Sequence, residues 1–365
     1  MGFYLTLSNL YFMNATIIGS GCYIPSKVAP NEGFSEHSFY NNDGTPFHHE
    51  NDVIIEKFKA ITGISERRYI KDDLTTSDIA YLAAKQAVED ASIDAETLDY
   101  IIVGHNYGDV KHNTPQSDTV PSIASRVKHL LKIKNPDCVA FDVLFGCPGW
   151  LEGLIQSNVY IKAGQAKRCL VIGAETLSRV IDQHDRDSMI YSDGAGATVV
   201  EAINDDNTGV LAHKTATYTY DEAHFIYFGE SNNQEINDAR RYIKMYGRKI
   251  YEFAISHVPA AMKACLDASG VSIDDVSKIL IHQANEKMDE AIVSRFYQLY
   301  DREMPEGIMP MTIQNLGNSS VATIPTLYDL IQRGSIEGHS FNKGDIIMFA
   351  SVGAGMNINA LVYKV

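Results

Sequence analysis

The chain repeats one arrangement of helical and apolar segments about half a chain apart. Residues 84–91 read AKQAVEDA and precede Ser-Ile-Asp and an apolar segment at 100–104. Residues 261–268 read AMKACLDA and precede the same Ser-Ile-Asp and an apolar segment at 278–282. In each copy, the pattern predicts a helix followed by a buried strand.

A second pair of segments matches in the same order. Residues 169–173 read CLVIG and precede Gly-Ala-Gly at 194–196, whereas residues 346–350 read IIMFA and precede Gly-Ala-Gly at 353–355. One match could arise by chance, but two in the same order indicate duplication. Two similar halves would bring equivalent strand ends together around a pseudo-twofold axis.

Strands alternate with helices in both copies, which predicts an α/β fold with a largely buried sheet. Residues 98–103 form an apolar run, with the single exception of Asp99, and include β-branched side chains, as in a strand buried on both faces. Residues 242–268 predict a long helical stretch that is interrupted by Pro259. Residues 285–300 carry apolar side chains on one helical face. We expect an N-terminal half at residues 13–204 and a C-terminal half at residues 205–365.

Length and charge exclude several classes of protein. The chain has 365 residues, of which 45% are hydrophobic, and a formal charge of −15. A large core is possible, and the lack of a Lys/Arg cluster argues against a nucleic-acid partner. No apolar run approaches the ~20 residues of a membrane span. Residues 1–12 are apolar but lack the basic start of a signal peptide.

The five cysteines are widely spaced and form no C-x-x-C motif. Their odd number and spacing argue against a disulfide framework and against a zinc site. They fit a reducing compartment, so we expect a cytoplasmic protein.

Cys147 lies where a strand is expected to turn into a helix. Residues 139–145 are apolar except for Asp142 and predict a buried strand, and Gly146 allows a sharp turn. Pro148 suits the first position of a helix. A thiol at a helix N-terminus faces the positive end of the dipole, which lowers its pKa and favours a nucleophile. The alternative is a small buried hydrophobic residue.

The second half offers two partners for such a thiol. His282 ends the strand at 278–281 and begins the motif HQAN, and Asn318 lies in a GNSS turn before a helix. Sites in α/β proteins form at strand ends. The alternatives are a histidine bonded to backbone and an asparagine that caps a helix.

Together, Cys147, His282, Asn318 and the terminal Gly-Ala-Gly resemble the β-ketoacyl-acyl-carrier-protein synthase III family. The motifs TGI at 62–64 and YSDGAGA at 191–197 strengthen the resemblance, which spans nearly the whole chain. It implies a thiolase-like fold, with duplicated α/β halves in a five-layered αβαβα arrangement, and a homodimer.

The resemblance also implies an activity. Cys147 would take an acyl group from a thioester, and a malonyl-type thioester on acyl carrier protein would then condense with it, losing CO₂. His282 and Asn318 would donate hydrogen bonds to the thioester carbonyl. The N–H groups of Cys147 and Ala354 would form the oxyanion hole. No metal or organic cofactor is implied, and the substrates are thioesters of coenzyme A or acyl carrier protein, as in fatty acid initiation or related lipid and polyketide synthesis.

The resemblance places further residues along the substrate path: Val120, Trp150, Arg186, Arg248, Ala284, Gly353 and Gly355. Lys57 and Ile61 stand where the family often has a tryptophan and an arginine that hold coenzyme A, which favours a carrier protein as donor. Val120, expected in the partner subunit's acyl pocket, replaces a large aromatic residue and indicates room for longer acyl groups. Trp150 either lines the pocket or fills the core.

Other activities within this fold stay open. Relatives with the same three residues join acyl groups to other nucleophiles and make alkylresorcinols, quinolones or O-acyl products. A 3-hydroxy-3-methylglutaryl synthase needs a glutamate near the cysteine, and none is expected there. A thiolase needs a second cysteine in the last glycine-rich segment, which has none. An inactive carrier-binding paralogue is the non-enzymatic alternative.

Overall fold

The computed structural model describes residues 13–205, 207–236 and 239–365. The expectation that residues 1–12 are not a signal peptide therefore concerns a segment outside the described residues. In the described part of the chain, no helix combines the length and apolar character that a membrane span requires.

Two mixed sheets form the framework, and four strands of the first have counterparts in the same order in the second. The first has the order β1-β9-β8-β4-β7, with β1 (Asn14–Tyr23), β9 (Asp193–Ile203), β8 (Arg168–Thr176), β4 (Tyr100–Gly104) and β7 (Val139–Val143). The second has the order β10-β15-β14-β13, with β10 (Gly209–Thr217), β15 (Asn357–Lys364), β14 (Ile346–Gly353) and β13 (Val276–Ile281).

Strand directions repeat as well as strand order. In the first sheet, β1 and β8 run antiparallel to β9, and β4 runs parallel to β8. In the second, β10 and β14 run antiparallel to β15, and β13 runs parallel to β14. The repeat in the sequence is thus a repeat of topology. The division between residues 204 and 205 stays a prediction.

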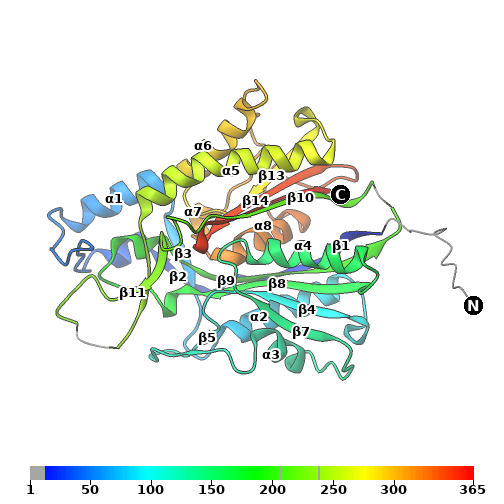
Figure 1. The fold of residues 1–365 in the computed structure, drawn as a ribbon. Helices are drawn as coiled ribbons and strands as arrows, with labels where there is room; N and C mark the ends of the chain where they lie inside the picture. Colours follow the sequence, from blue (N-terminus) through cyan, green and yellow to red (C-terminus); the bar gives the residue numbers. More distant parts are fainter. Residues whose placement is uncertain (1–12, 206, 237–238) are drawn as a thin grey trace, which may run out of the picture.

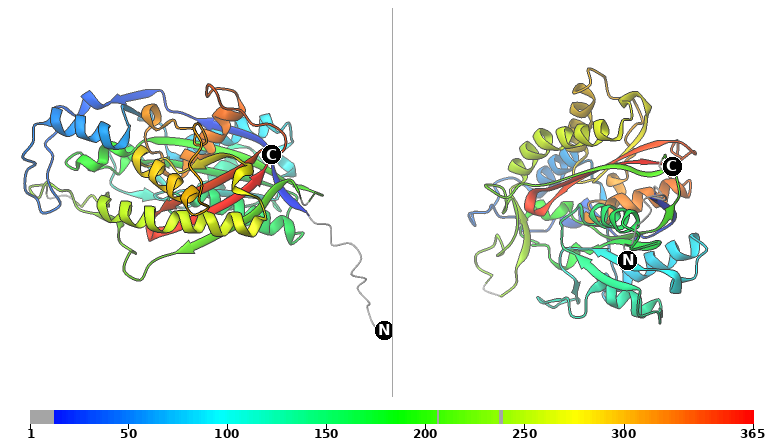
Figure 2. Two further views of the ribbon diagram at one scale, coloured as in Figure 1. Left: turned by 90° about the horizontal axis from the view of Figure 1, so that it is seen from above. Right: turned by 45° about the vertical axis from the view of Figure 1, so that its right-hand side comes forward.

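Helices form three layers around the two sheets, and Figure 1 shows all five layers edge-on. α2 (Thr76–Asp90) and α3 (Ile123–Leu130) cover the outer face of the first sheet. α4 (Gly149–Lys162) and α8 (Thr323–Gln332) lie between the sheets. α5 (Gly247–Ser269) lies along β10, β15 and β14, with α6 (Glu286–Gln298) beside it (Figure 2). This confirms the expected five-layered αβαβα fold.

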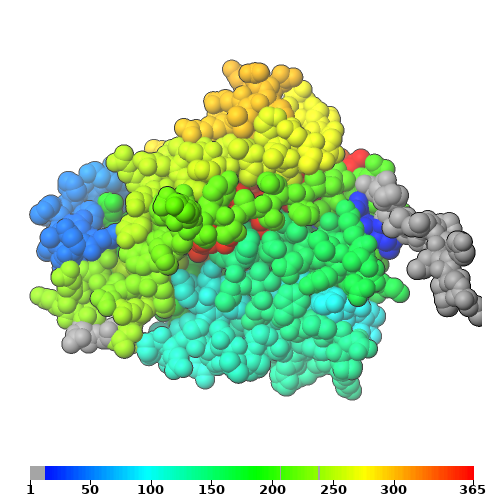
Figure 3. Space-filling model, in the orientation of Figure 1, coloured from blue at the N-terminus to red at the C-terminus, as the bar shows by residue number. Residues whose placement is uncertain are grey.

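The smaller elements gather at one end of the sheets, on the left of Figure 1. They are α1 (Asn51–Thr62), α7 (Ile313–Leu316), and the strand pairs β2 (Lys27–Pro30) with β3 (Glu66–Tyr69), β5 (Asp109–Val110) with β6 (Ser117–Asp118), and β11 (Ile226–Gly229) with β12 (Tyr242–Met245). In the space-filling view, the first half (cyan and green) occupies one side and α5 and α6 (yellow) the other (Figure 3).

Two sequence expectations about elements are wrong. Residues 242–268 were expected to be helical with an interruption at Pro259, but the first four form β12 and α5 continues through the proline. Proline removes the N–H that would pair with the carbonyl of Ile255. The Arg295 side chain donates to that carbonyl instead, at 2.9 Å, so the helix is not broken. In addition, β7 is an edge strand in this chain rather than a buried one, and Val139 is 48% exposed.

Trp150 belongs to the core rather than to a pocket wall. Its side chain is 1% exposed, packs edge-on against Phe349 with ring centroids 5.8 Å apart, and joins the cluster between the two sheets. α4, which carries it, lies so close to the first sheet that a Cβ on Gly104 would meet the Gly149 carbonyl carbon at 2.6 Å. The helix that follows Cys147 is therefore held rigidly by packing.

Replacing Trp150 should destabilise the fold without changing substrate choice. We expect Trp150→Ala to lower the free energy of unfolding by about 3–5 kcal/mol, because it leaves a large cavity between the sheets. Trp150→Phe should lower the free energy of unfolding by clearly less. Urea unfolding measures both changes. An unchanged stability with an altered ranking of acyl donors would instead assign Trp150 to the pocket.

Candidate active site

Four residues from separate elements line one small cavity of about 70 Å³. Cys147 follows β7, His282 follows β13, Ala354 follows β14, and Asn318 lies between α7 and α8. The first comes from one half of the duplicated fold and the other three from the second. The pseudo-twofold arrangement expected from the repeat therefore assembles the site.

Two glycines allow the backbones at the cysteine to approach closely. Gly146 has φ +65°, and a Cβ there would meet the Ala354 backbone nitrogen at 2.6 Å. A Cβ on Gly353 would meet the Cys147 backbone nitrogen at 2.4 Å. Because neither position has room for a side chain, the turn at 353–355 lies directly against the Cys147 turn. The two nitrogens expected to form an oxyanion hole are thus neighbours.

The Cys147 thiol differs from the sequence expectation in one respect. Pro148 is the N-cap and α4 begins at Gly149, so the cysteine precedes the helix as expected. However, burial of the sulfur raises the pKa of Cys147 to about 11, and the hydrogen bond from Ser320 only partly offsets it. The expected lowering of the thiol pKa is therefore wrong. With this raised pKa, the thiol form predominates at neutral pH, so a base that accepts its proton would favour attack by the sulfur.

His282 is neutral, and its hydrogen bonds favour one tautomer. Burial lowers the pKa of His282 to about 4. The Thr323 hydroxyl donates to the Ser320 carbonyl at 3.0 Å and lies 2.8 Å from His282 Nδ1. Since the hydroxyl has one proton, Nδ1–H must be the donor to Thr323, which leaves a lone pair on Nε2. The ring therefore bonds a hydroxyl and not the backbone.

Asn318 is oriented by its own turn. Its backbone N–H donates to the Ile190 carbonyl at 3.0 Å, and its carbonyl accepts from Ser192 N–H at 2.8 Å. Its side-chain Oδ1 accepts from the Ser320 N–H at 2.7 Å, so the amide nitrogen remains for a ligand in the cavity. Asn318 does not cap α8, whose N-cap is Ala322.

Sequence reasoning missed a buried polar chain behind the cysteine. The Ser320 hydroxyl lies 3.3 Å from Cys147 Sγ, and Asn106 Nδ2 donates to Ser320 Oγ at 3.1 Å and to Glu175 Oε2 at 2.6 Å. Burial raises the pKa of Glu175 to about 7. Glu175 therefore lies behind Asn106 and Ser320, two residues from the Cys147 sulfur, and does not line the small cavity. The signal was present, since Glu175 is an acidic residue at the end of an apolar strand.

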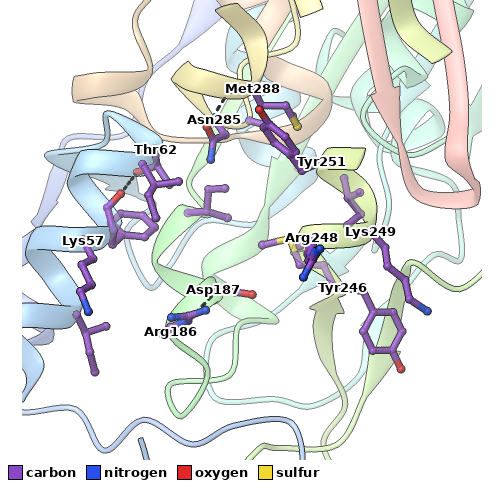
Figure 4. Close-up of a pocket in the computed structure, with 18 of the residues that line it drawn as sticks. Lys57, Thr62, Arg186, Asp187, Tyr246, Arg248, Lys249, Tyr251, Asn285 and Met288 are labelled. Carbon is purple, nitrogen blue, oxygen red and sulfur yellow. Dashed lines mark hydrogen bonds and ion pairs between the residues drawn. The ribbon is translucent and has the colours of Figure 1, made fainter. Parts of the chain in front are cut away.

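A larger cavity of about 780 Å³ adjoins the small one. Both are lined by Ile190, Met245, Ile250, Ala284 and Met288. The larger cavity opens between α1 and the start of α5, and Figure 4 shows residues from both elements around it. Together, the two cavities form a mostly apolar channel from the surface to Cys147, and Ala284 lies along it as expected.

Basic side chains surround the outer part of this channel. Lys57 of α1 and Arg248 and Lys249 of α5 line it with Arg186, as Figure 4 shows. The Arg186 guanidinium stacks 4.7 Å from the Phe47 ring centroid, whereas Arg248 is exposed and pairs with Glu252 at 2.9 Å. In a chain with charge −15, this group of cations is an evident place for an anionic ligand. Ile61 also lines the channel.

The remaining predicted residues divide into two groups. Gly353 and Gly355 flank Ala354 in the turn beside Cys147. Val120 is 84% exposed and lines neither cavity of this chain. Its expected place in a partner's pocket, like the absence of a cofactor, stays a prediction.

Known proteins with similar sequences belong to the family that the site residues resemble. The family model for 3-oxoacyl-[acyl-carrier-protein] synthase III matches residues 141–219, and the model for its C-terminal region matches residues 266–365. A relative from Clostridium perfringens, named beta-ketoacyl-[acyl-carrier-protein] synthase III, is 33% identical over 96% of this chain and 99% of its own. One with the same name from Prochlorococcus marinus is 31% identical over 95% of each chain.

Solved structures lead to the same family. The crystal structure of 3-oxoacyl-[acyl-carrier-protein] synthase III from Aquifex aeolicus matches with a TM-score of 0.78 and 30% identity, over 96% of this chain and 100% of that one. The Thermus thermophilus enzyme matches with a TM-score of 0.79 and 26% identity, over 96% and 99% of the two chains. The chain belongs to the 3-oxoacyl-[acyl-carrier-protein] synthase III family.

Proposed function

We propose that the protein is a condensing enzyme in which Cys147 carries an acyl group and joins it to a malonyl-type thioester. The observation that carries the proposal is the meeting of Cys147, His282 and Asn318 around one cavity at the inner end of a cation-rimmed channel. The channel admits a long, thin substrate and leaves a thioester next to the sulfur.

In the first half-reaction, Cys147 attacks the carbonyl carbon of an acyl thioester. Because the thiol is neutral, its proton must leave as the C–S bond forms, and the unprotonated Nε2 of His282 accepts it. The imidazolium then returns that proton to the departing thiol. The negative oxygen of the tetrahedral intermediate is stabilised by the backbone N–H groups of Cys147 and Ala354.

In the second half-reaction, a malonyl-type thioester loses CO₂ and its enolate attacks the acyl carbonyl carbon. The Asn318 amide is a fixed donor to the enolate oxygen. His282 would be a second donor in the tautomer that carries its proton on Nε2, in which the Thr323 hydroxyl turns from the Ser320 carbonyl and donates to Nδ1. In that exchange, Nδ1 gives its proton to solvent and Nε2 takes one from solvent. The Cys147 thiolate leaves and a β-ketoacyl thioester forms. Every group that acts in these two half-reactions is a side chain or a backbone group of the protein.

Acyl carrier protein is the proposed partner for the extender. A carrier's phosphopantetheine arm is long, thin and bears a phosphate, which suits an apolar channel with Lys57, Arg186, Arg248 and Lys249 at its outer part. The presence of Lys57 and Ile61 in the lining supports a carrier protein over coenzyme A as acyl donor. We place the reaction in fatty acid initiation or related lipid synthesis in the cytoplasm, where the free cysteines of the described chain would stay reduced.

We also propose a homodimer that pairs β7 with its copy. β7 is an edge of the first sheet, and an unpaired edge is a ready site for strand pairing. Val139 and Leu144 at its ends and Val120 in the nearby loop are 48%, 68% and 84% exposed, a concentration of apolar surface that a second copy would cover. Val120 would then reach the partner's acyl pocket.

Acyl transfer to Cys147 can be read directly by intact-protein mass spectrometry. We expect one acyl mass on the wild-type protein after incubation with a suitable member of a panel of acyl thioesters, and none on Cys147→Ala. Asn318→Ala should still be acylated but should condense about 10²–10³-fold more slowly, because it lacks a donor for the enolate. Acylation of the Cys147→Ala variant would refute the assignment.

The pH dependence of Cys147 alkylation follows from its pKa. Because burial raises the pKa of Cys147 to about 11, the thiolate fraction grows with pH throughout the neutral range. The iodoacetamide rate constant should rise roughly tenfold per pH unit between pH 7 and 9, without a plateau. Peptide mass spectrometry identifies the labelled cysteine. A plateau near pH 7 would show a low-pKa thiolate and contradict the neutral-thiol mechanism.

The cations at the outer channel should affect binding of the carrier rather than chemistry. We expect Arg248→Glu to raise KM for a malonyl-carrier substrate about tenfold at low salt with little change in kcat, since it reverses a charge at the entrance. Arg302→Glu, at a surface ion pair with Asp274, is the matched control. Equal effects of the two substitutions on KM would show that only the overall charge of the protein matters for carrier binding.

A further inference from the structure

We propose that Ser320 and Asn106 are positioning residues for Cys147. Asn106, oriented by Glu175, turns the Ser320 hydroxyl so that it donates its proton to the cysteine sulfur and stabilises the thiolate as it forms. The inference rests on the proposed role of Cys147 as nucleophile and adds a polar chain that sets its reactivity.

The direction of the hydrogen bonds follows from the number of protons available. The amide nitrogen of Asn106 has two protons and acts only as a donor. One goes to Glu175 Oε2 at 2.6 Å and the other to Ser320 Oγ at 3.1 Å. Ser320 Oγ therefore accepts from Asn106, and its single proton is left for Cys147 Sγ at 3.3 Å. In the structure, this proton points to the sulfur, so the Ser320 hydroxyl donates to Cys147 Sγ.

Glu175 holds the Asn106 amide in this orientation. Its Oε2 accepts from both the backbone N–H of Asn106, at 2.8 Å, and the side-chain Nδ2. A turned amide would place Oδ1 of Asn106 against that oxygen, and two acceptors would face each other in a buried site. Oε1 of Glu175 has no partner among the described residues and can bear a proton. The orientation is thus independent of whether Glu175 is ionised.

Ser320 is itself fixed by its backbone. It has φ +52°, a left-handed conformation that is uncommon for a residue with a side chain. Its N–H donates to Asn318 Oδ1 and its carbonyl accepts from Thr323 Oγ1. Thr323 in turn contacts His282. One residue therefore links the nucleophile, the proposed enolate donor and the proposed base, and a shift of Ser320 would disturb all three.

Two groups near the sulfur change the pKa of Cys147 in opposite directions. A negative Glu175 raises the pKa of Cys147, whereas the hydrogen bond from Ser320 lowers it. Other titratable groups near Cys147 and Glu175 come from several elements. They are His282 after β13, Tyr107 and His105 in the 105–121 loop, Tyr191 before β9 and Asp193 in β9. Among these and the other described residues that line the small cavity, none is Lys or Arg, so the hydroxyl donor is important.

The test compares the pH profile of Cys147 alkylation in variants, which needs no substrate. We expect Ser320→Ala to shift the plot of alkylation rate against pH toward higher pH by roughly one unit. At pH 8, the alkylation rate constant should therefore be roughly tenfold lower. Asn106→Ala should give a smaller shift in the same direction, because the hydroxyl can then turn away. Glu175→Gln keeps an acceptor for Asn106 and removes the negative charge, so Cys147 should react faster.

Ser157→Ala is the matched control, because the Ser157 hydroxyl in α4 is also buried but bonds the Gly153 carbonyl of its own helix and the Cys169 thiol rather than Cys147. Its alkylation profile should equal that of the wild type. If Ser320→Ala does not fold, Asn106→Ala carries the test. A wild-type profile in both variants would overturn the inference, even if Cys147 is acylated normally. Failure of all thioesters to acylate the wild type would instead refute the proposed function.

Discussion

The close contact between two turns is the constraint on which the site depends. The Gly353 turn of the second half lies against the Cys147 turn of the first half, with no space for a side chain between them. This contact is possible only because each half contributes a strand that ends at the same place and a glycine at the point of contact. The packing of α4 between the sheets keeps the two turns in contact. The duplicated fold is thus a means of bringing two backbones together.

Burial of this contact has a chemical consequence. A sulfur enclosed between the halves is poorly solvated, which raises its pKa and keeps it protonated. The same enclosure keeps His282 neutral, with a free lone pair. A neutral thiol beside a neutral imidazole is less reactive toward oxidants than a thiolate, because the thiolate is the nucleophilic form. Hydrogen-bond donors around the sulfur then matter more than nearby charges.

Much of the framework could be predicted from the sequence because it depends on local periodicity. The repeat around residues 84–104 and 261–282 predicted two halves, and four strands of the first sheet have counterparts in the same order and directions in the second. The expectations failed where a distant residue decides the local structure. α5 passes through Pro259 because Arg295, on another helix, bonds the freed carbonyl. β7 was expected to be a buried strand because its residues are mostly apolar. Its position at the edge of the sheet depends on which strands pair, and its own sequence does not display that.

The site was predictable to the extent that each residue belongs to a recognisable sequence motif. Cys147, His282 and Asn318 do, and they line one cavity as expected. Asn106 and Glu175 lie near strand ends but belong to no such motif, and their roles depend on which proton goes to which acceptor across separate elements. Such directions are set most strongly where water does not easily substitute for a missing partner. The family motif therefore identifies the reaction, whereas the polar chain behind the cysteine is the proposed determinant of how readily this sulfur reacts.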